Sequence, residues 1–368
     1  MSRSPTVSGV WRNKIVWVVA AGVVVLLLTG AVIAVALRSR PAASPTPVAA
    51  PSGAPSAAPS APPPGADIAG PLDLLLIGVD TRVSIPDWEP HADAIMLLHV
   101  DAGLTSGYLY SLPRDLRVNM PAFAPARFSG GRYKITEAMS RGSRVPGSKR
   151  PNVKHGYELL TRTISSYTGI KTFQAGAILT FAGLSRLTDA LGGVTLRIDQ
   201  KVVSLHRRPD GTMRKRIGST YIGPRAVYLP GARRLTGWQA IDYARQRYTS
   251  GSDYTRQRHQ RQLVKALLSE AEAGGLATDQ VKLLAVVRAL GDTLVYLGGR
   301  TPFEYAYALR NLRPENLTLV GLPGGSIFSG GGYVGEQLQP AGKGFLRAVA
   351  SGDPATYLRT HPALINKR

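Results

Sequence analysis

Carboxylate and guanidinium side chains gather beside three apolar runs of this sequence. Asp80 and Arg82 directly follow the first run, and Asp93 directly precedes the second. Arg114 and Asp115 come just after the third run. In an α/β protein, ligands bind at the ends of the strands and in the loops just beyond them. We therefore expect these side chains to face one crevice.

A second group of polar side chains lies further along the chain. Arg245 and Arg247 are two residues apart, so on an ideal helix they diverge and one of them can be merely solvated. Asp253 follows them. Arg256 and Gln260 are four residues apart on a predicted helix and therefore share a face.

Together these residue types indicate a site for phosphate and a metal ion. Two carboxylates can hold Mg²⁺ while phosphate oxygens complete its coordination shell. Arginine suits phosphate because its planar guanidinium donates two parallel hydrogen bonds. A single Asp or Arg beside a strand is more often a turn former or an exposed ion pair, so this prediction depends on the whole set.

The elements that position these residues alternate between strands and helices. Short apolar runs bounded by turn residues predict strands, and apolar residues at helical spacing predict helices. The alternation predicts an α/β fold, with a central mixed β-sheet covered by helices in one domain over residues 67–368. The predicted strands are 73–79, 94–100, 107–112, 194–198 and 317–322, and the predicted helices are 155–167, 181–191, 237–247, 255–273 and 279–297.

The N-terminal part of the chain predicts a membrane anchor. Residues 15–37 carry no charge and, as a helix, extend about 34 Å, enough to cross a hydrocarbon core. A cleaved signal peptide is the alternative, but the run is longer than signal-peptide apolar regions. Residues 1–14 are then cytoplasmic, and the Pro-, Ala- and Ser-rich residues 38–66 form a linker. The predicted location is the cell membrane, single-pass, with the C-terminal domain extracytoplasmic.

Composition excludes several classes of site. The chain has no Cys, which rules out disulfides, zinc–thiolate sites and thiol nucleophiles. It lacks nucleophile-elbow, Walker A, metalloprotease and dinucleotide-binding motifs. The net charge of +22 predicts an anionic partner, namely nucleic acid, anionic lipid or a phosphorylated small molecule. An extracytoplasmic domain makes nucleic acid the least suitable of the three.

The histidines and the basic loops are predicted to be structural or solvated. His155, His206 and His259 are expected at the surface, and His91 and His99 are candidates for packing. Basic, Gly- and Pro-rich stretches at 141–154 and 207–216 are expected to be surface loops.

Six ordered motifs resemble the LytR–CpsA–Psr family of cell-envelope phosphotransferases. They span residues 74–262, and an N-terminal anchor is also usual in that family. The segments LPGG and GGGYVGEQL match it more loosely. The motifs are LLLIGVDTR, HADAIMLLHVD, LYSLPRDLRVNMP, KITEAM, LTDALGGV and LTGWQAIDYARQRYTSGSDYTRQRHQRQ.

The resemblance implies an extracytoplasmic, Mg²⁺-dependent transferase of a Gram-positive envelope. Such an enzyme moves a glycopolymer phosphate from a polyprenyl-pyrophosphate carrier onto a peptidoglycan hydroxyl and forms a phosphodiester. Asp80 and Asp93 match the family's Mg²⁺ positions, and Asp93 or Asp253 can assist the acceptor hydroxyl. The matching pyrophosphate-binding positions are Arg82, Arg114, Lys134, Arg245, Arg247, Arg256 and Gln260, with Arg114 also contributing to catalysis.

Two positions depart from the family pattern. His91 and His259 stand where the family often has Arg, and a neutral imidazole donates only one hydrogen bond.

A membrane-tethered module that binds anionic polymer or lipid pyrophosphate without chemistry is one alternative function. Hydrolysis of the pyrophosphate to water is the other, since it needs the same residues. The lipid tail of the carrier requires an apolar channel between the helices and the sheet.

Overall fold

The computed structural model describes residues 62–79, 89–275, 286 and 288–366. The predicted segments 1–14 and 15–37, most of the linker, and the candidate residues Asp80 and Arg82 lie outside these ranges. Within the described ranges, no helix combines the length and the apolar character needed to cross a bilayer.

A six-stranded mixed sheet forms the centre of the domain, in the order β13-β6-β1-β2-β3-β14. The β1–β2, β2–β3 and β6–β13 pairs are antiparallel, whereas the β1–β6 and β3–β14 pairs are parallel. The bounds are Leu72–Val79 for β1, Ala92–Val100 for β2, Gly107–Leu112 for β3, Ala175–Thr180 for β6, Leu294–Gly298 for β13 and Leu317–Val320 for β14.

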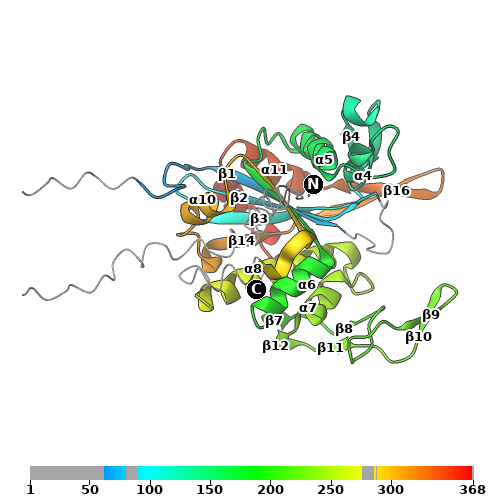
Figure 1. Ribbon diagram of the computed structural model, residues 1–368. Helices are drawn as coiled ribbons and strands as arrows, with labels where there is room; N and C mark the ends of the chain where they lie inside the picture. The colour runs from blue at the N-terminus through cyan, green and yellow to red at the C-terminus, as the bar shows by residue number, and fades with distance from the viewer. Residues whose placement is uncertain (1–61, 80–88, 276–285, 287, 367–368) are drawn as a thin grey trace, which may run out of the picture.

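Helices cover both faces of this sheet, so the molecule has three layers (Figure 1). Side chains alternate along β1: Leu74 and Leu76 enter one core, and Leu75 and Ile77 enter the other. Both faces are buried, which explains why the strands read as continuous apolar runs. The first core is covered by α6 (Phe181–Ala190), α7 (Gly237–Arg245), α8 (Ser252–Ala273) and α10 (Pro302–Ala308), and the second by α4 (Glu137–Ser143), α5 (Val153–Thr168), α11 (Pro340–Ala350) and α12 (Pro354–Thr360).

Five two-stranded sheets lie outside the central sheet. They pair β4 (Arg117–Met120) with β5 (Gly131–Lys134), β7 (Val194–Ile198) with β12 (Gly231–Leu235), β8 (Val202–Val203) with β11 (Val227–Tyr228), β9 (Lys215–Ile217) with β10 (Thr220–Ile222), and β15 (Gly324–Ser329) with β16 (Gly332–Leu338). Short 3₁₀ helices occupy Ala124–Ala126, Gly291–Thr293, Pro314–Asn316 and Pro362–Leu364.

The α/β fold with a central mixed sheet is confirmed, and one predicted element is wrong in part. The predicted helix 279–297 extends too far, because Leu294–Gly298 is strand β13, paired with β6 at the sheet edge. The Val, Tyr and Leu residues of this segment suit a strand, and pairing with β6 overrides their helical spacing. Residues 276–285 and 287 lie outside the described part. The predicted strand 194–198 exists, but it pairs with β12 outside the central sheet.

Candidate functional site

The start of β2 and the end of β3 bring a carboxylate and a guanidinium together. These strands are antiparallel, and Ile95 pairs with Leu112. The register therefore places Asp93, at the head of β2, beside Arg114, just beyond the end of β3. Arg114 donates a hydrogen bond from its terminal nitrogen to Asp93 Oδ1 and forms an ion pair with it. Both side chains are largely buried, with 25% and 18% of their surfaces exposed.

The first turns of α8 add a second ion pair to this cluster. Arg256 donates to the backbone carbonyl of Asp93 at 3.3 Å and pairs with Asp253 Oδ1 at 2.7 Å. Gln257 donates to the other oxygen of Asp253 at 2.9 Å. Helix α8 begins after Gly251, whose φ of 81° is in the left-handed region that favours glycine. Asp253 is thus in the first turn, where the helix dipole favours a carboxylate.

Electrostatics differ between the two arginines of the cluster. Burial lowers the pKa of Arg256, Asp253 partly offsets this, and the neighbouring charges of Arg114 and Arg247 lower it further. Burial also works against the charged form of Arg114, but three nearby aspartates, Asp93 first, raise its pKa overall. Arg256 Nε is buried and has no hydrogen-bond partner among the described residues. The cluster therefore holds a cation with an unused donor, next to further positive charge.

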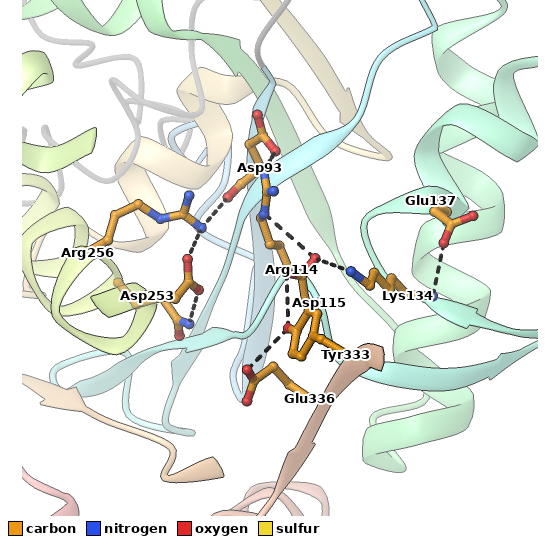
Figure 2. Close-up of polar contacts among 10 residues, drawn as sticks. Asp93, Arg114, Asp115, Lys134, Glu137, Asp253, Arg256, Tyr333 and Glu336 are labelled. Carbon is orange, nitrogen blue, oxygen red and sulfur yellow. Dashed lines mark hydrogen bonds and ion pairs between the residues drawn. The ribbon is translucent and has the colours of Figure 1, made fainter. Parts of the chain in front are cut away.

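The cluster continues through Asp115 to the hairpin of β15 and β16 (Figure 2). Asp115 Oδ1 lies 3.8 Å from Arg114 Nε and 3.6 Å from Lys134 Nζ. The Tyr333 hydroxyl lies 3.2 Å from Asp115 Oδ2 and 3.2 Å from Glu336 Oε1. Burial and these two carboxylates raise the pKa of Tyr333, so its hydroxyl remains a donor. Lys134 is thus joined to Arg114 through a shared carboxylate.

Tyr333 and Glu336 of this network were not predicted, and Asp115 was expected to face the crevice but was given no role in the site. Tyr333 and Glu336 fall in the GGGYVGEQL segment, which resembled the family only loosely. The β16 strand reaches the cluster because the Glu336 backbone N–H donates to the Asp115 carbonyl at 2.8 Å.

Of the pair Arg245 and Arg247, only Arg245 lies on helix α7. Helix α7 ends at Arg245, and Gln246 has extended backbone with ψ of 129°. Arg247 is half-buried and close enough to Arg256 to lower its pKa. The Arg245 guanidinium instead lies over the Phe181 ring, with its carbon 4.2 Å from the ring centre. The two arginines therefore have different contacts, although both lower the pKa of His206.

An apolar cavity between the sheet and helices α6–α8 begins next to the polar cluster. Arg245 and Gln260 both line it, together with apolar side chains such as Leu76, Ala177 and Leu263. Ala94, which directly follows Asp93, also lines the cavity. On α8, Gln260 lies one turn beyond Arg256, so one helix face carries both the polar cluster and the cavity wall. The predicted apolar channel thus has a candidate, about 70 Å³ in volume in this conformation.

The surface prediction for His259 is wrong. Its side chain is fully buried, its ring stacks on Tyr243 with centres 4.3 Å apart, and its Nε2 lies 3.1 Å from Asp199 Oδ1. Position 259 falls on the buried side of α8, between Arg256 and Leu263 at helical spacing. His91 is half-buried, with its Nδ1 3.1 Å from the Glu89 carbonyl.

The described residues contain no group of three or more His, Cys, Asp or Glu side chains placed to hold a metal ion. Asp93 is the one predicted metal ligand inside the described ranges, since Asp80 lies outside them. Asp80 directly follows Val79, and Val79 pairs with Ala92, the residue before Asp93.

The fold and the cluster define a class of three-layer α/β proteins with paired carboxylates and arginines at one end of a mixed sheet, beside an apolar cavity. The sequence model of the LytR_cpsA_psr family matches residues 49–338, and the chain belongs to this family. The resemblance noted from the motifs is thereby confirmed.

Two relatives support this assignment. The cell wall biosynthesis protein LcpA of Corynebacterium glutamicum is 26% identical over 287 residues, which cover 72% of this chain and 52% of LcpA. Biofilm regulatory protein A of Streptococcus mutans serotype c is 26% identical over 271 residues, which cover 72% of this chain and 59% of that protein. The chain therefore spans little more than half the length of these relatives.

Solved structures share the fold at lower sequence identity. A Streptococcus agalactiae protein superimposes with a TM-score of 0.58 at 19% identity, covering 76% of this chain and 87% of that protein. TagV of B. subtilis gives a TM-score of 0.53 at 15% identity, with 78% and 97% covered. TagT bound to LI-WTA gives a TM-score of 0.52 at 17% identity, with 76% and 90% covered.

Proposed function

We propose that the protein is a membrane-anchored transferase that moves a glycopolymer phosphate from a polyprenyl-pyrophosphate carrier onto a peptidoglycan hydroxyl. The observation that carries the proposal is the meeting of Arg114 and Arg256 at Asp93, beside an apolar cavity. Family membership supports it, as do the name of LcpA, a cell wall biosynthesis protein, and the LI-WTA bound to TagT.

The arginine cluster is suited to a pyrophosphate. Arg114 and Arg256 come from different elements and approach the same residue, so two guanidinium groups meet at Asp93. Arg247 adds positive charge near Arg256, and Lys134 adds it on the Asp115 side. Fixed guanidinium groups in a half-buried site stabilise charge that develops on a leaving phosphate, because they need no reorganisation during the reaction.

The apolar cavity is suited to the first part of a polyprenyl tail. Its walls come from both the sheet and the helices, and its polar end is marked by Arg245 and Gln260. At about 70 Å³ it holds only a short stretch of hydrocarbon in this conformation. A longer tail would therefore extend beyond this cavity.

Mg²⁺ is part of the proposal. The donor set fits a hard cation, because Asp93 supplies carboxylate oxygens and Asp80 is the second predicted ligand. When bound, the ion would neutralise part of the pyrophosphate charge. Since Asp93 already pairs with Arg114, the same carboxylate would also keep that guanidinium directed at the substrate.

The transfer needs no covalent enzyme intermediate. The acceptor hydroxyl attacks the phosphorus that carries the glycan, and the bond from that phosphorus to the bridging oxygen breaks. Polyprenyl phosphate leaves with the electron pair, and the hydroxyl proton passes to a carboxylate. Asp93 and Asp253 both stand in the cluster and are the two candidates for that proton.

The test is turnover of the full chain in detergent with Mg²⁺, a lipid-pyrophosphate glycan and a peptidoglycan acceptor. We expect release of polyprenyl phosphate together with a glycan–acceptor phosphodiester, and loss of both products in Asp93→Ala. Glu158→Ala, a carboxylate on the opposite helical layer that pairs with Arg162, is the matched control. If Asp93→Ala and the unaltered protein turn over alike, the site assignment is wrong.

The same assay separates the two alternatives. Substrate binding that weakens uniformly with salt and gives no product indicates a non-catalytic module. Product formation without acceptor indicates hydrolysis of the pyrophosphate by water.

A further inference from the structure

Residues 202–229 form a lobe beside helices α6–α8 that the proposed transfer does not use. Strands β8 and β11 make the base of the lobe, and the β9–β10 hairpin makes its tip. Figure 1 shows this hairpin projecting away from the central sheet, beyond the helical layer.

Buried polar contacts give the lobe a fixed shape and a fixed attachment. The Arg214 side chain points inward, and its guanidinium donates to the backbone carbonyls of Leu205 and Tyr221, each at 2.6 Å. At the base, the buried Asp242 carboxylate of α7 accepts hydrogen bonds from Ser204 at 3.0 Å and Tyr228 at 2.9 Å. The lobe is therefore a rigid extension of α7.

The two faces of the hairpin differ in character. Directly opposed residues of an antiparallel pair share a face, so Ile217, Ile222 and Lys215 lie together on one face. The other face carries Tyr221, whose ring packs edge-on against His206 with centres 5.0 Å apart. The isoleucine face is exposed, with Ile217 56% and Ile222 41% accessible. The register pairs Thr220 with Ile217, Tyr221 with Arg216 and Ile222 with Lys215.

Exposed apolar and basic side chains are concentrated in the lobe. Isolated exposed hydrophobic residues are ordinary, but five of the nine large ones exposed in the described part of the chain fall between 213 and 229. They are Met213, Ile217, Ile222, Val227 and Leu229. Asp210 is the one acidic residue of the lobe, whereas Lys215, Arg216 and Arg225 are exposed basic residues, Arg207 and Arg208 are half-buried, and Arg214 is buried.

We propose that the β9–β10 hairpin rests on an anionic bilayer, with Ile217 and Ile222 in the interfacial region and the basic side chains on the lipid phosphates. The combination of exposed isoleucines with basic side chains favours a bilayer over a soluble anionic polymer as the partner. A polymer would neutralise the basic side chains but leave both isoleucines in water, whereas a bilayer surface accommodates both kinds of group.

This docking would orient the candidate site toward the membrane. A groove beneath the lobe is lined by Tyr221 and His206 on one side and by Phe181 and Arg245 on the other. Phe181 and Arg245 also line the apolar cavity, so the groove and the cavity adjoin. A hairpin held at the bilayer surface therefore brings this end of the cavity close to the lipid phase.

The test uses a fluorescent label on the hairpin turn of the full chain reconstituted into vesicles. The chain has no native Cys, so Ser219→Cys provides a unique attachment point. Lys149→Cys is the control, in an exposed basic loop without exposed large hydrophobic side chains. The readout is quenching by a lipid-borne quencher, in vesicles of phosphatidylcholine with or without phosphatidylglycerol.

We expect quenching at position 219 in the anionic vesicles and little at position 149. The double substitution Ile217→Ser with Ile222→Ser should reduce the quenching about tenfold, because two apolar side chains no longer enter the interface. Ile365→Ser, which alters an exposed isoleucine outside the lobe, should leave it unchanged. Raising salt from about 0.1 M to about 1 M should weaken the quenching, because screening shortens to about 3 Å.

Three results would overturn the docking. They are equal quenching at the two positions, no effect of the double serine substitution, and an emission change when soluble polyphosphate is added to the phosphatidylcholine vesicles without any quenching in the anionic vesicles. Asp93→Ala should behave as the unaltered protein in this assay. Failure of docking is thus distinguished from failure of the proposed transfer, which is measured by turnover.

Discussion

Arg114 is the residue through which the two halves of the polar cluster are joined. It pairs with Asp93 on one side and lies 3.8 Å from Asp115 on the other. We expect Arg114→Ala to lower kcat/KM for transfer by about 10²–10³, the cost of removing one preorganised donor to a developing oxyanion. Arg114→Lys should recover only part of this, because an ammonium lacks the planar fork. Steady-state kinetics with a defined carrier would measure both.

A matched arginine separates this effect from a loss of positive charge. Arg347 is exposed in the last turn of α11, on the opposite helical layer. Arg347→Ala removes the same charge and should leave kcat/KM unchanged. Equal losses in the two variants would mean that Arg114 contributes only to the overall field of a basic domain.

His259 predicts a pH dependence of stability. Its burial lowers the pKa of the imidazole, and Asp199 only partly offsets this. As pH falls below about 6.5, the unfolded chain takes up a proton at this residue before the folded chain does. The free energy of unfolding should therefore fall with decreasing pH, and it should fall less steeply in His259→Gln. Urea unfolding at a series of pH values measures the two slopes.

His361→Gln is the control for that slope, because its ring is stacked on Tyr357 near the surface rather than in the core. A slope in His259→Gln as steep as that of the unaltered protein would show that the proton uptake occurs elsewhere.

At the scale of elements, the sequence predicted those strands and helices whose own residues carry a clear local pattern. The strand 107–112 agrees with β3, and the helix 181–191 agrees with α6 to within one residue. Strand β6 was not predicted, because its small residues Ala175, Gly176 and Ala177 carry a weak strand signal and its parallel pairing with β1 involves residues about 100 positions away.

Long-range contacts also limited the prediction of the site. The antiparallel β2–β3 pair could be inferred, and with it the approach of Asp93 to Arg114. The approach of Tyr333 to Asp115 spans 218 positions and depends on where the β15–β16 hairpin crosses, which no local pattern encodes. Asp80 and Arg82 remain predictions from the sequence, since they lie outside the described residues.

The junction between α7 and the lobe predicts a stability change. Asp242 is buried and accepts from Tyr228, Ser204 and the Gln246 amide, the last at 2.9 Å. Tyr228→Phe removes one donor from a carboxylate that stays buried. We expect this to lower the free energy of unfolding by about 1–3 kcal/mol. Tyr248→Phe, at a side chain that is 74% exposed, should have almost no effect.

Chemical denaturation measures both tyrosine variants. A cost for Tyr228→Phe no larger than that of the exposed control would mean that the lobe is attached by its apolar contacts alone. The rigid attachment that we infer for the docking hairpin would then lose its main support.

At the scale of the whole molecule, one sheet places a polar cluster and an apolar cavity side by side. Residues from β2, from the end of β3 and from α8 meet at the head of β2, and the next residue along β2 already faces the cavity. A substrate with a charged head and a hydrocarbon tail matches this division. The lobe on α7 borders the same cavity through the groove that contains Arg245.

The division between head and tail can be tested by filling the cavity. Ala177 is buried on β6 and lines the cavity, whereas Ala175 is buried on the same strand and face but does not line it. We expect Ala177→Leu to lower kcat/KM about tenfold for a long polyprenyl carrier and to leave a short-chain carrier unaffected. Ala175→Leu should change kcat/KM equally for the two carriers. Overpacking at that position would alter the stability of the fold and not the space for the tail. Kinetics with both carriers, alongside thermal unfolding of each variant, make the comparison. Equal losses for the long and short carriers in Ala177→Leu would mean that the tail lies elsewhere, and the cavity would then be only a packing defect beside the arginine cluster.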